Sequence, residues 1–237
     1  MISVIMPYWN RLELLTRSLD RMGELYPDYD MEIVIADDGS EEECVVTQSY
    51  YPWPVHVISM PRKNAALNPC VPINLAVKAS RGYVIVLTNP EIYHPTAILG
   101  SMLDELTSKA GPKGYIIAST WSTDYNRWYA HSSITSKRNA ALGRLPLPPN
   151  SGLHFCSMMY RKFFDEVGGF DEEYREGQGV EDNDFLWALH EAGANFRMRN
   201  DLMVEHTSTP TVWPPGGIER NSEIYRKKWS HVNEAFS

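Results

Sequence analysis

The stretch MEIVIADDGS, residues 31–40, decides the fold class of this chain. Residues 31–36 form a mainly apolar run rich in β-branched side chains, and the polar turn formers Asp37 to Ser40 follow at once. This pattern predicts a strand over residues 31–36 that ends in a turn.

A second strand and a helix precede this stretch. Residues 2–7, ISVIMP, are a short apolar run ended by Pro7, which favours a buried strand over a helix. Between the two runs, large apolar residues recur at three- and four-residue spacing along one helix face: Leu12, Leu15, Leu19 and Met22. The order strand, helix, strand predicts a parallel βαβ unit.

The same alternation continues along the chain. Further strands are predicted at residues 55–58, 83–87, 114–118, 155–159 and 196–204, and helices at 74–79, 95–106, 161–167, 181–192 and 221–229. Residues 119–152 are rich in Ser, Thr, Asn, Pro and aromatic side chains, so we expect loops and short irregular elements there. The chain is predicted to be one α/β domain over residues 1–237, with a mostly parallel central sheet flanked by helices.

Composition excludes several classes of protein. The 237 residues carry 22 basic and 30 acidic side chains, and the resulting charge of −8 disfavours stable binding to nucleic acid. The longest apolar runs fall short of the roughly 18 residues that span a bilayer, and the three cysteines show neither metal-ligand spacing nor a disulfide framework. We expect a soluble, cytoplasmic protein with at most peripheral membrane contact.

Polar side chains follow the predicted strands at the sheet edge where α/β proteins bind ligands. They include Asp37, Asp38, Asn89, Glu91 and His206. The chain has no GxGxxG, GxxxxGK[ST] or GxSxG motif, which disfavours a dinucleotide site, a P-loop and a hydrolase elbow. Oxygen ligands with one imidazole suit a divalent cation that carries phosphates.

A cluster of carboxyls opens one predicted helix. In VEDNDF, residues 180–185, the acids Glu181, Asp182 and Asp184 follow the loop of Gly177 and Gly179. Acidic residues commonly cap helices, but one cap would suffice for that purpose. Three carboxylates at this point favour a catalytic or binding role over capping alone.

Together these segments resemble the family-2 glycosyltransferases of GT-A fold. The resemblance rests on SVIMPYWNR (3–11), EIVIADDGS (32–40), GYVIVLTNPEI (82–92), GGFDEEY (168–174) and VEDNDF (180–185). The segment GQGVEDND (177–184) is also similar to the acceptor-side motif of β-galactosyltransferase-like enzymes. The resemblance implies a Rossmann-like domain with a nucleotide-sugar-binding half (1–118), an acceptor and catalytic half (119–206), and a C-terminal loop and helix (207–237).

The resemblance implies roles for residues on the donor side. Pro7 and Tyr8 would border the uracil of a UDP-sugar, and Asp38, with Asp37 beside it, would accept a hydrogen bond from the base. Asn89 would contact the donor. UDP is favoured over GDP and dTDP as the carrier.

The chain departs from the family at its metal motif. The family usually has Asp-x-Asp where this chain reads Thr88-Asn89-Pro90-Glu91. Glu91 and His206 are therefore the expected ligands of Mn²⁺ or Mg²⁺, with further oxygens supplied by the pyrophosphate.

The resemblance also implies an acceptor site. Asp182 would act as general base on an acceptor hydroxyl in an inverting transfer, Glu181 and Asp184 would orient the acceptor sugar, and Trp128 would stack on it. The acceptor would be a glycan or another hydroxyl compound. Alternatives are a retaining transferase, a degenerate domain that binds nucleotide-sugar or glycan without turnover, and, disfavoured by the charge, a transferase acting on DNA bases.

Overall fold

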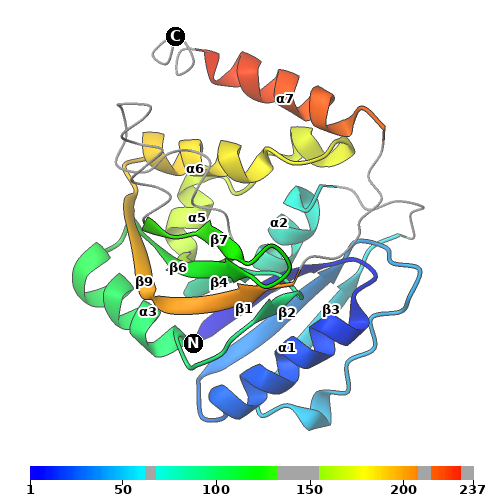
Figure 1. Cartoon of the computed structure of the whole chain (residues 1–237), viewed down its shortest axis with the longest axis vertical. Helices are drawn as coiled ribbons and strands as arrows, with labels where there is room; N and C mark the ends of the chain where they lie inside the picture. The colour runs from blue at the N-terminus through cyan, green and yellow to red at the C-terminus, as the bar shows by residue number, and fades with distance from the viewer. Residues whose placement is uncertain (62–67, 133–154, 208–214, 231–237) are drawn as a thin grey trace.

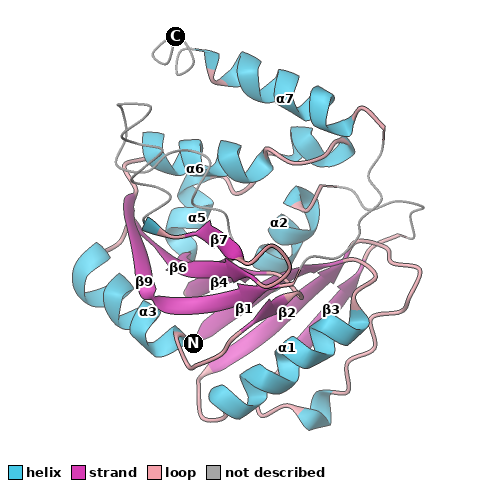
Figure 2. Cartoon of the chain, viewed as in Figure 1, coloured by secondary structure: helices cyan, strands magenta, loops and turns pink. Residues whose placement is uncertain are grey.

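One sheet runs through the computed structural model, which describes residues 1–61, 68–132, 155–207 and 215–230. Its strands are β1 (Ile2–Tyr8), β2 (Met31–Asp37), β3 (Val55–Ser59), β4 (Val84–Thr88), β5 (Ile92–Tyr93), β6 (Gly114–Ser122), β7 (Arg127–Ala130), β8 (Cys156–Tyr160) and β9 (Asn195–His206). In the described ranges their order is β3-β2-β1-β4-β8-β6-β9-β5, and β7 pairs with β6 beside this path (Figures 1 and 2). Both halves of the chain build this sheet, so the predicted α/β domain is confirmed.

Helices cover both faces of the sheet. They are α1 (Leu12–Leu25), α2 (Cys70–Ala79), α3 (Leu99–Glu105), α5 (Arg161–Val167), α6 (Glu181–Glu191) and α7 (Gly217–Lys228), with short turns η1 (Gln48–Tyr50), η2 (Leu106–Ala110) and η3 (Glu172–Glu176). Along β1, Val4 and Met6 pack with α1 and α3, whereas Ile5 packs with α2, α5 and α6. This alternation places α1 and α3 on one face and α2, α5 and α6 on the other (Figure 1).

The sheet changes direction at β8. Strands β3, β2, β1 and β4 are parallel, as the repeated strand–helix pattern predicts. β8 runs antiparallel to both of its neighbours, β4 and β6, and β9 returns parallel to β6. The prediction of a mostly parallel sheet therefore holds for the first four strands, while the sheet as a whole is mixed.

The prediction of irregular structure over residues 119–152 is wrong for its first part. β6 continues to Ser122, and β7 pairs back onto it as a hairpin strand. The rings of Trp121 and Trp128 meet edge to face across this hairpin, with centroids 4.9 Å apart. Aromatic cross-strand pairs stabilise such hairpins, and their residues here lie in a polar stretch that hides the strand pattern. Residues 133–152 lie outside the described ranges.

Two helices begin earlier than predicted. α2 begins at Cys70 rather than Asn74. Pro72 does not prevent this earlier start, because it falls in the first turn, where proline is tolerated. α7 begins at Gly217 rather than Asn221. Within the described part of the chain, no helix has the length and apolar character needed to cross a bilayer, and all three cysteines are buried as free thiols.

Candidate active site

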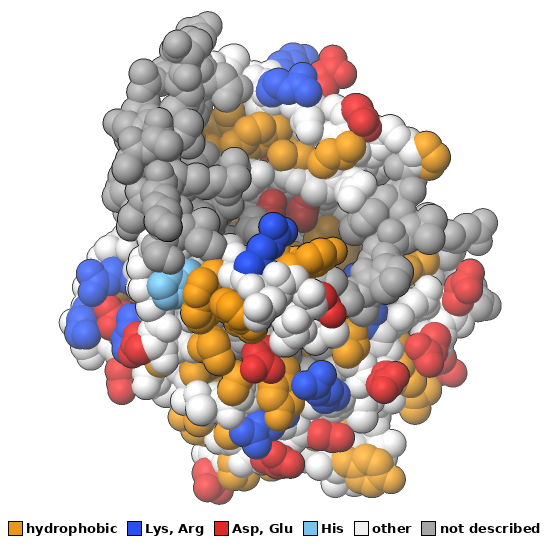
Figure 3. Space-filling view, viewed as in Figure 1, with side chains coloured by type: hydrophobic (Ala, Val, Ile, Leu, Met, Phe, Trp, Pro, Cys, Tyr) orange, Lys and Arg blue, Asp and Glu red, His pale blue; other side chains and the backbone are white. Residues whose placement is uncertain are grey.

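A cleft of about 80 Å³ lies between the carboxyl ends of two strands and the start of α6. Its walls come from β1 and β4 and the residues after them, from α2, and from α6: Ile5, Pro7, Pro69, Ile73, Leu87, Thr88, Asn89, Phe155, Phe170, Glu181 and Asp182. Acidic side chains are visible in a hollow between the sheet and the layer of α6 and α7 (Figure 3). The structure thus brings Pro7 and Asn89, predicted on the donor side, together with the predicted base Asp182.

The start of α6 has a strained backbone. Val180, the residue before the helix, has a φ of 67°, which is rare for a β-branched side chain, and no side chain caps the helix there. Asn221 of α7 is fully buried and donates to the carbonyl oxygens of Tyr174 (3.0 Å) and Gly179 (3.1 Å). Gln178 donates its N–H to Gly217 O at 3.0 Å. α7 therefore holds the loop that places Glu181 and Asp182.

Glu181 and Asp182 are adjacent carboxyls whose charges act on each other. Glu181 is buried and accepts a hydrogen bond of 2.6 Å from Asn68 Nδ2, whereas Asp182 is partly exposed. Burial, and then the charge of Asp182, raises the pKa of Glu181. Burial also raises the pKa of Asp182, against the hydrogen bond from the N–H of Asn183. Glu181 keeps its proton longer than Asp182, which leaves Asp182 as the carboxylate that can accept one.

Asn68 is a site residue that sequence reasoning missed. Its Oδ1 accepts from the N–H of Cys70 at the start of α2, while its amide reaches Glu181. An asparagine followed by a proline at a helix start is a recognisable capping signal. The pattern Asn68-Pro69 could therefore have located the start of α2. It could not have shown the contact of Asn68 with Glu181.

Asp184 does not face the cleft. Its carboxylate accepts hydrogen bonds from Trp229 Nε1 (2.7 Å), Lys228 Nζ (2.9 Å) and Tyr174 Oη (3.1 Å). Two positions along a helix turn the side chain by roughly 200°, so Asp182 and Asp184 lie on opposite sides of α6. The predicted acceptor role of Asp184 is thus not supported, and its contacts instead tie α7 to α6.

The predicted donor residues at the ends of β1 and β2 do not all face the cleft. Pro7 lines the cleft, but Tyr8 is buried in the cluster on the α1 face because neighbouring strand residues point in opposite directions. Asp37 and Asp38 are both buried at the end of β2. Asp37 Oδ1 accepts from the N–H of Ser40 (2.9 Å), and Asp38 donates its N–H to Tyr8 O (2.9 Å). These contacts brace the turn, and Tyr8 is not brought to the cleft.

Glu91 and His206 meet as the sequence predicts. Ile92 pairs with His206 between β5 and β9, and the imidazole Nε2 lies 3.7 Å from Glu91 Oε1. Arg11, which sequence reasoning left without a role, places its guanidinium 2.6 Å from the same oxygen. Burial would raise the pKa of Glu91, but His206 and Arg11 outweigh it and hold that pKa below its ordinary value. The Phe155 ring packs against His206 and also lines the cleft.

The Glu91–His206 pair fits a divalent cation in part. Glu91 Oε2 and His206 Nδ1 are buried and make no hydrogen bond to the residues described. A carboxylate and an imidazole suit Mn²⁺, but the described ranges contain no group of three or more His, Cys, Asp or Glu placed to hold an ion. Thr88, in the first Asp position of the family motif, donates to Phe155 O at 2.8 Å. Further ligands would have to come from a bound diphosphate.

Trp128 is not among the residues that line the cleft. Its ring stacks on His131 with centroids 4.5 Å apart and meets Trp121 edge to face. One ring face is therefore covered by a neighbour in this structure. The predicted sugar-stacking role of Trp128 stays a prediction.

Two curated relatives are similar to this chain. Chondroitin synthase of Escherichia coli is 23% identical over 242 residues, which cover 88% of this chain and 35% of the relative. Chondroitin synthase of Pasteurella multocida (strain Pm70) is 26% identical over 243 residues, covering 88% and 25%. The chain thus spans about a third and a quarter of the length of these relatives.

Two solved structures share the fold. Residues 1–349 of S. aureus TarS in complex with UDP superpose with a TM-score of 0.69 at 17% identity, covering 95% of this chain and 63% of that one. Mannosyltransferase PcManGT from Pyrobaculum calidifontis, in complex with GDP-Man and Mn²⁺, gives 0.63 at 15% identity, covering 98% and 64%. These likenesses confirm the predicted GT-A fold.

The family assignment rests on the sequence. The model of "Glycosyl transferase family 2" matches residues 3–168, from β1 through α5. This segment is well over half of the chain and contains the strand-end residues Pro7, Asp38, Asn89 and Glu91, while the acids of α6 follow it. The chain therefore belongs to glycosyl transferase family 2.

Proposed function

We propose that this glycosyltransferase moves a sugar from a UDP-sugar to an acceptor hydroxyl with inversion, and that Asp182 is the general base. One observation carries the proposal: Asp182 lines the same cleft as Pro7, at the carboxyl end of β1, and Asn89, directly after β4. Ligands of open α/β sheets bind at this edge. Asp182, at the other wall, would supply the proton acceptor.

In the proposed transfer, one C–O bond forms at the anomeric carbon and another breaks. The acceptor oxygen attacks the anomeric carbon from the face opposite the diphosphate, and Asp182 takes the hydroxyl proton as the new C–O bond forms. The old C–O bond breaks, and its electron pair leaves with the nucleoside diphosphate. Burial supports this role because it raises the pKa of Asp182 and so makes its carboxylate a stronger base.

The neighbouring groups support the transfer. Glu181, which keeps its proton longer than Asp182, would donate a hydrogen bond to the acceptor sugar. Glu91 and His206 would hold Mn²⁺ or Mg²⁺, and such an ion would neutralise charge on the diphosphate. The likeness to TarS, solved with UDP, supports a uridine nucleotide as carrier of the sugar. The likeness to PcManGT, solved with GDP-Man, makes a guanosine nucleotide the competing carrier. The chondroitin synthase relatives support a glycan as acceptor.

The first test is calorimetric titration of UDP and GDP into the protein, with manganese and with EDTA. We expect UDP to bind more tightly than GDP, and manganese to tighten UDP binding if Glu91 and His206 ligate an ion. A screen of UDP-sugars for hydrolysis and transfer then identifies the sugar. Tighter binding of GDP would overturn the uridine assignment.

A second reading, a binding domain without turnover, has one observation in its favour. Thr88 and Pro90 stand where the family has its two aspartates, and Thr88 is engaged with Phe155. Binding of UDP with no transfer or hydrolysis from any UDP-sugar would support this reading. Turnover that Asp182→Asn abolishes would exclude it.

Glu181→Gln is expected to change only the alkaline side of the pH profile of activity. Asp182 loses its proton first, above the ordinary aspartate range because burial raises its pKa, and activity rises as it does so. Glu181 is still protonated at that point, so glutamine mimics it and the acid side stays the same. At higher pH the wild type loses the Glu181 proton and activity falls, whereas the variant retains an amide donor.

The measurement is kcat/KM of both proteins over about pH 5–10. An alkaline decline of equal size and position in Glu181→Gln would contradict the assignment of that proton to Glu181. A shifted acid side would contradict the order in which the two carboxyls titrate.

A further inference from the structure

We propose that Arg11 binds the diphosphate of the donor and that Glu91 holds its guanidinium in place for that purpose. The inference deepens the proposed function and rests on it. It concerns a residue that lies outside the set expected from the sequence.

The backbone around Arg11 is fixed by the turn that follows β2. Asn10 has a φ of 48°, and its Oδ1 accepts from the N–H groups of Glu41 (2.8 Å) and Glu42 (3.2 Å). Ser40 Oγ accepts from the N–H of Asn10 at 3.0 Å. Arg11 O in turn accepts the N–H of Leu15 in the first turn of α1. Arg11 is therefore anchored just after β1, next to the turn of residues 40–42 that follows β2.

The side chain of Arg11 is also oriented. Its Nη1 lies 2.6 Å from Glu91 Oε1, and the Glu91 side chain is 8% exposed whereas that of Arg11 is 21% exposed. The carboxylate is thus the buried partner and the guanidinium the one nearer to solvent. A guanidinium has five N–H donors in a planar fork, so it can keep one carboxylate contact and bind a phosphate as well.

The charge at this sheet edge favours such a role. The family motif places two aspartates where this chain has Thr88 and Pro90, which leaves Glu91 as the carboxylate of that segment. Arg11 offsets the charge of Glu91, and His206 lies on the same oxygen. At this segment a diphosphate meets Arg11 beside one carboxylate, instead of the two aspartates of the family motif. The guanidinium would act on the diphosphate whether or not an ion is bound as well.

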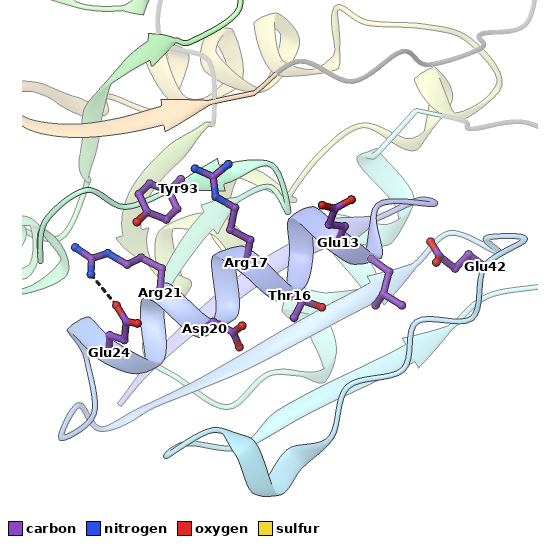
Figure 4. A pocket seen from close by; sticks show the side chains of 9 residues that line it. Glu13, Thr16, Arg17, Asp20, Arg21, Glu24, Glu42 and Tyr93 are labelled. Carbon is purple, nitrogen blue, oxygen red and sulfur yellow. Dashed lines mark hydrogen bonds and ion pairs between the residues drawn. The ribbon is translucent and has the colours of Figure 1, made fainter.

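A cationic side chain on α1, the helix that follows Arg11, provides the matched control. Arg17 lies on the outer face of the helix, where its guanidinium sits 4.5 Å from the centroid of the Tyr93 ring (Figure 4). This face forms one wall of a broad groove of about 680 Å³. Acids of α1 and of the turn after β2, including Glu13 and Glu42, also line the groove. Arg17→Ala removes the same charge six residues further along the chain without touching the Arg11–Glu91 pair.

The test compares Glu91→Gln with Arg11→Ala/Glu91→Gln by calorimetry, in EDTA and in manganese, using UDP and uridine. The two proteins differ only at Arg11, and neither carries a buried carboxylate that has lost its partner. The amide oxygen that Glu91→Gln introduces can still accept from the guanidinium, so Arg11 keeps its position in the reference variant. We expect the double variant to bind UDP about 10–100-fold more weakly than Glu91→Gln, as for a lost charge-assisted hydrogen bond. Uridine, which has no phosphate, should bind both equally, and Arg17→Ala should bind UDP as the wild type does.

Each outcome separates the two proposals. Equal UDP affinity of the two proteins, while the wild type binds UDP, overturns the role of Arg11 and leaves the proposed function standing. A wild type that binds neither UDP nor GDP in either condition overturns both. A parallel loss of uridine binding would mean that Arg11 acts on the structure of the turn rather than on phosphate, which also overturns the proposal.

Discussion

Asp182→Asn is expected to lower kcat for sugar transfer by a factor of about 10²–10⁴, the usual contribution of a positioned general base. Asparagine keeps the size of the side chain and can still accept the N–H of Asn183 through its amide oxygen. What it loses is the ability to take the proton of the acceptor hydroxyl. UDP affinity should stay within about twofold of the wild type, because the diphosphate is proposed to contact the β1 and β4 edge instead.

The comparison needs a variant with the same chemical change in the same helix. Glu191→Gln at the exposed end of α6 removes a carboxylate that faces solvent, and it should leave kcat unchanged. If Asp182→Asn retained a kcat within about tenfold of the wild type, proton transfer to this residue could not limit the reaction. A matching loss of UDP affinity would place the defect in binding.

Asp184→Ala is expected to lower the free energy of unfolding by about 2–4 kcal/mol. The substitution removes the acceptor of Trp229 Nε1 and Tyr174 Oη, and both of those groups belong to buried side chains. Lys228 also loses the contact, but it is 38% exposed and keeps Asp171 at 2.7 Å, so its share is small. Urea denaturation followed by tryptophan fluorescence measures the change.

An exposed aspartate paired with an arginine serves as the control. Asp201 accepts from Arg199 on the surface with 65% of its side chain exposed, and Asp201→Ala should cost less than about 1 kcal/mol. Equal stability losses for the two variants would show that Asp184 does not hold α7 in place. A loss confined to Asp184→Ala should also reduce activity, since Asn221 of α7 supports the loop before Val180.

The sequence predicts the elements of this domain best where a periodic pattern is long. The apolar runs of β1 and β2 and the leucine spacing of α1 specify their elements almost to the residue. β7 is not predicted from the sequence, because its four residues, Arg, Trp, Tyr and Ala, form a strand only through pairing with β6. Pairing is a tertiary property, so no local pattern reveals it.

The candidate site shows the same limit. Glu91 and His206 follow strands, and strand ends gather at one edge, so their meeting could be predicted. The roles of Asp182 and Asp184 could not be separated in the same way. Both are acids in the first turn of α6. Only the position of α7 shows that Lys228 and Trp229 bind Asp184 and leave Asp182 to the cleft. Arg11 lacks a signal of its own because any arginine after a strand looks like a surface charge.

The place of β8 in the sheet has a consequence for how the chain folds. β4 has a hydrogen-bonding edge that is covered only when residues 156–160 arrive from well beyond the first parallel strands. During synthesis the strands β1 to β4 can assemble, but they expose that edge until β8 inserts between β4 and β6. Such distant pairing is slow because a long loop must close first. The nascent protein therefore passes through a stage in which its open sheet edge can pair with another chain, and chaperone protection matters most at that stage.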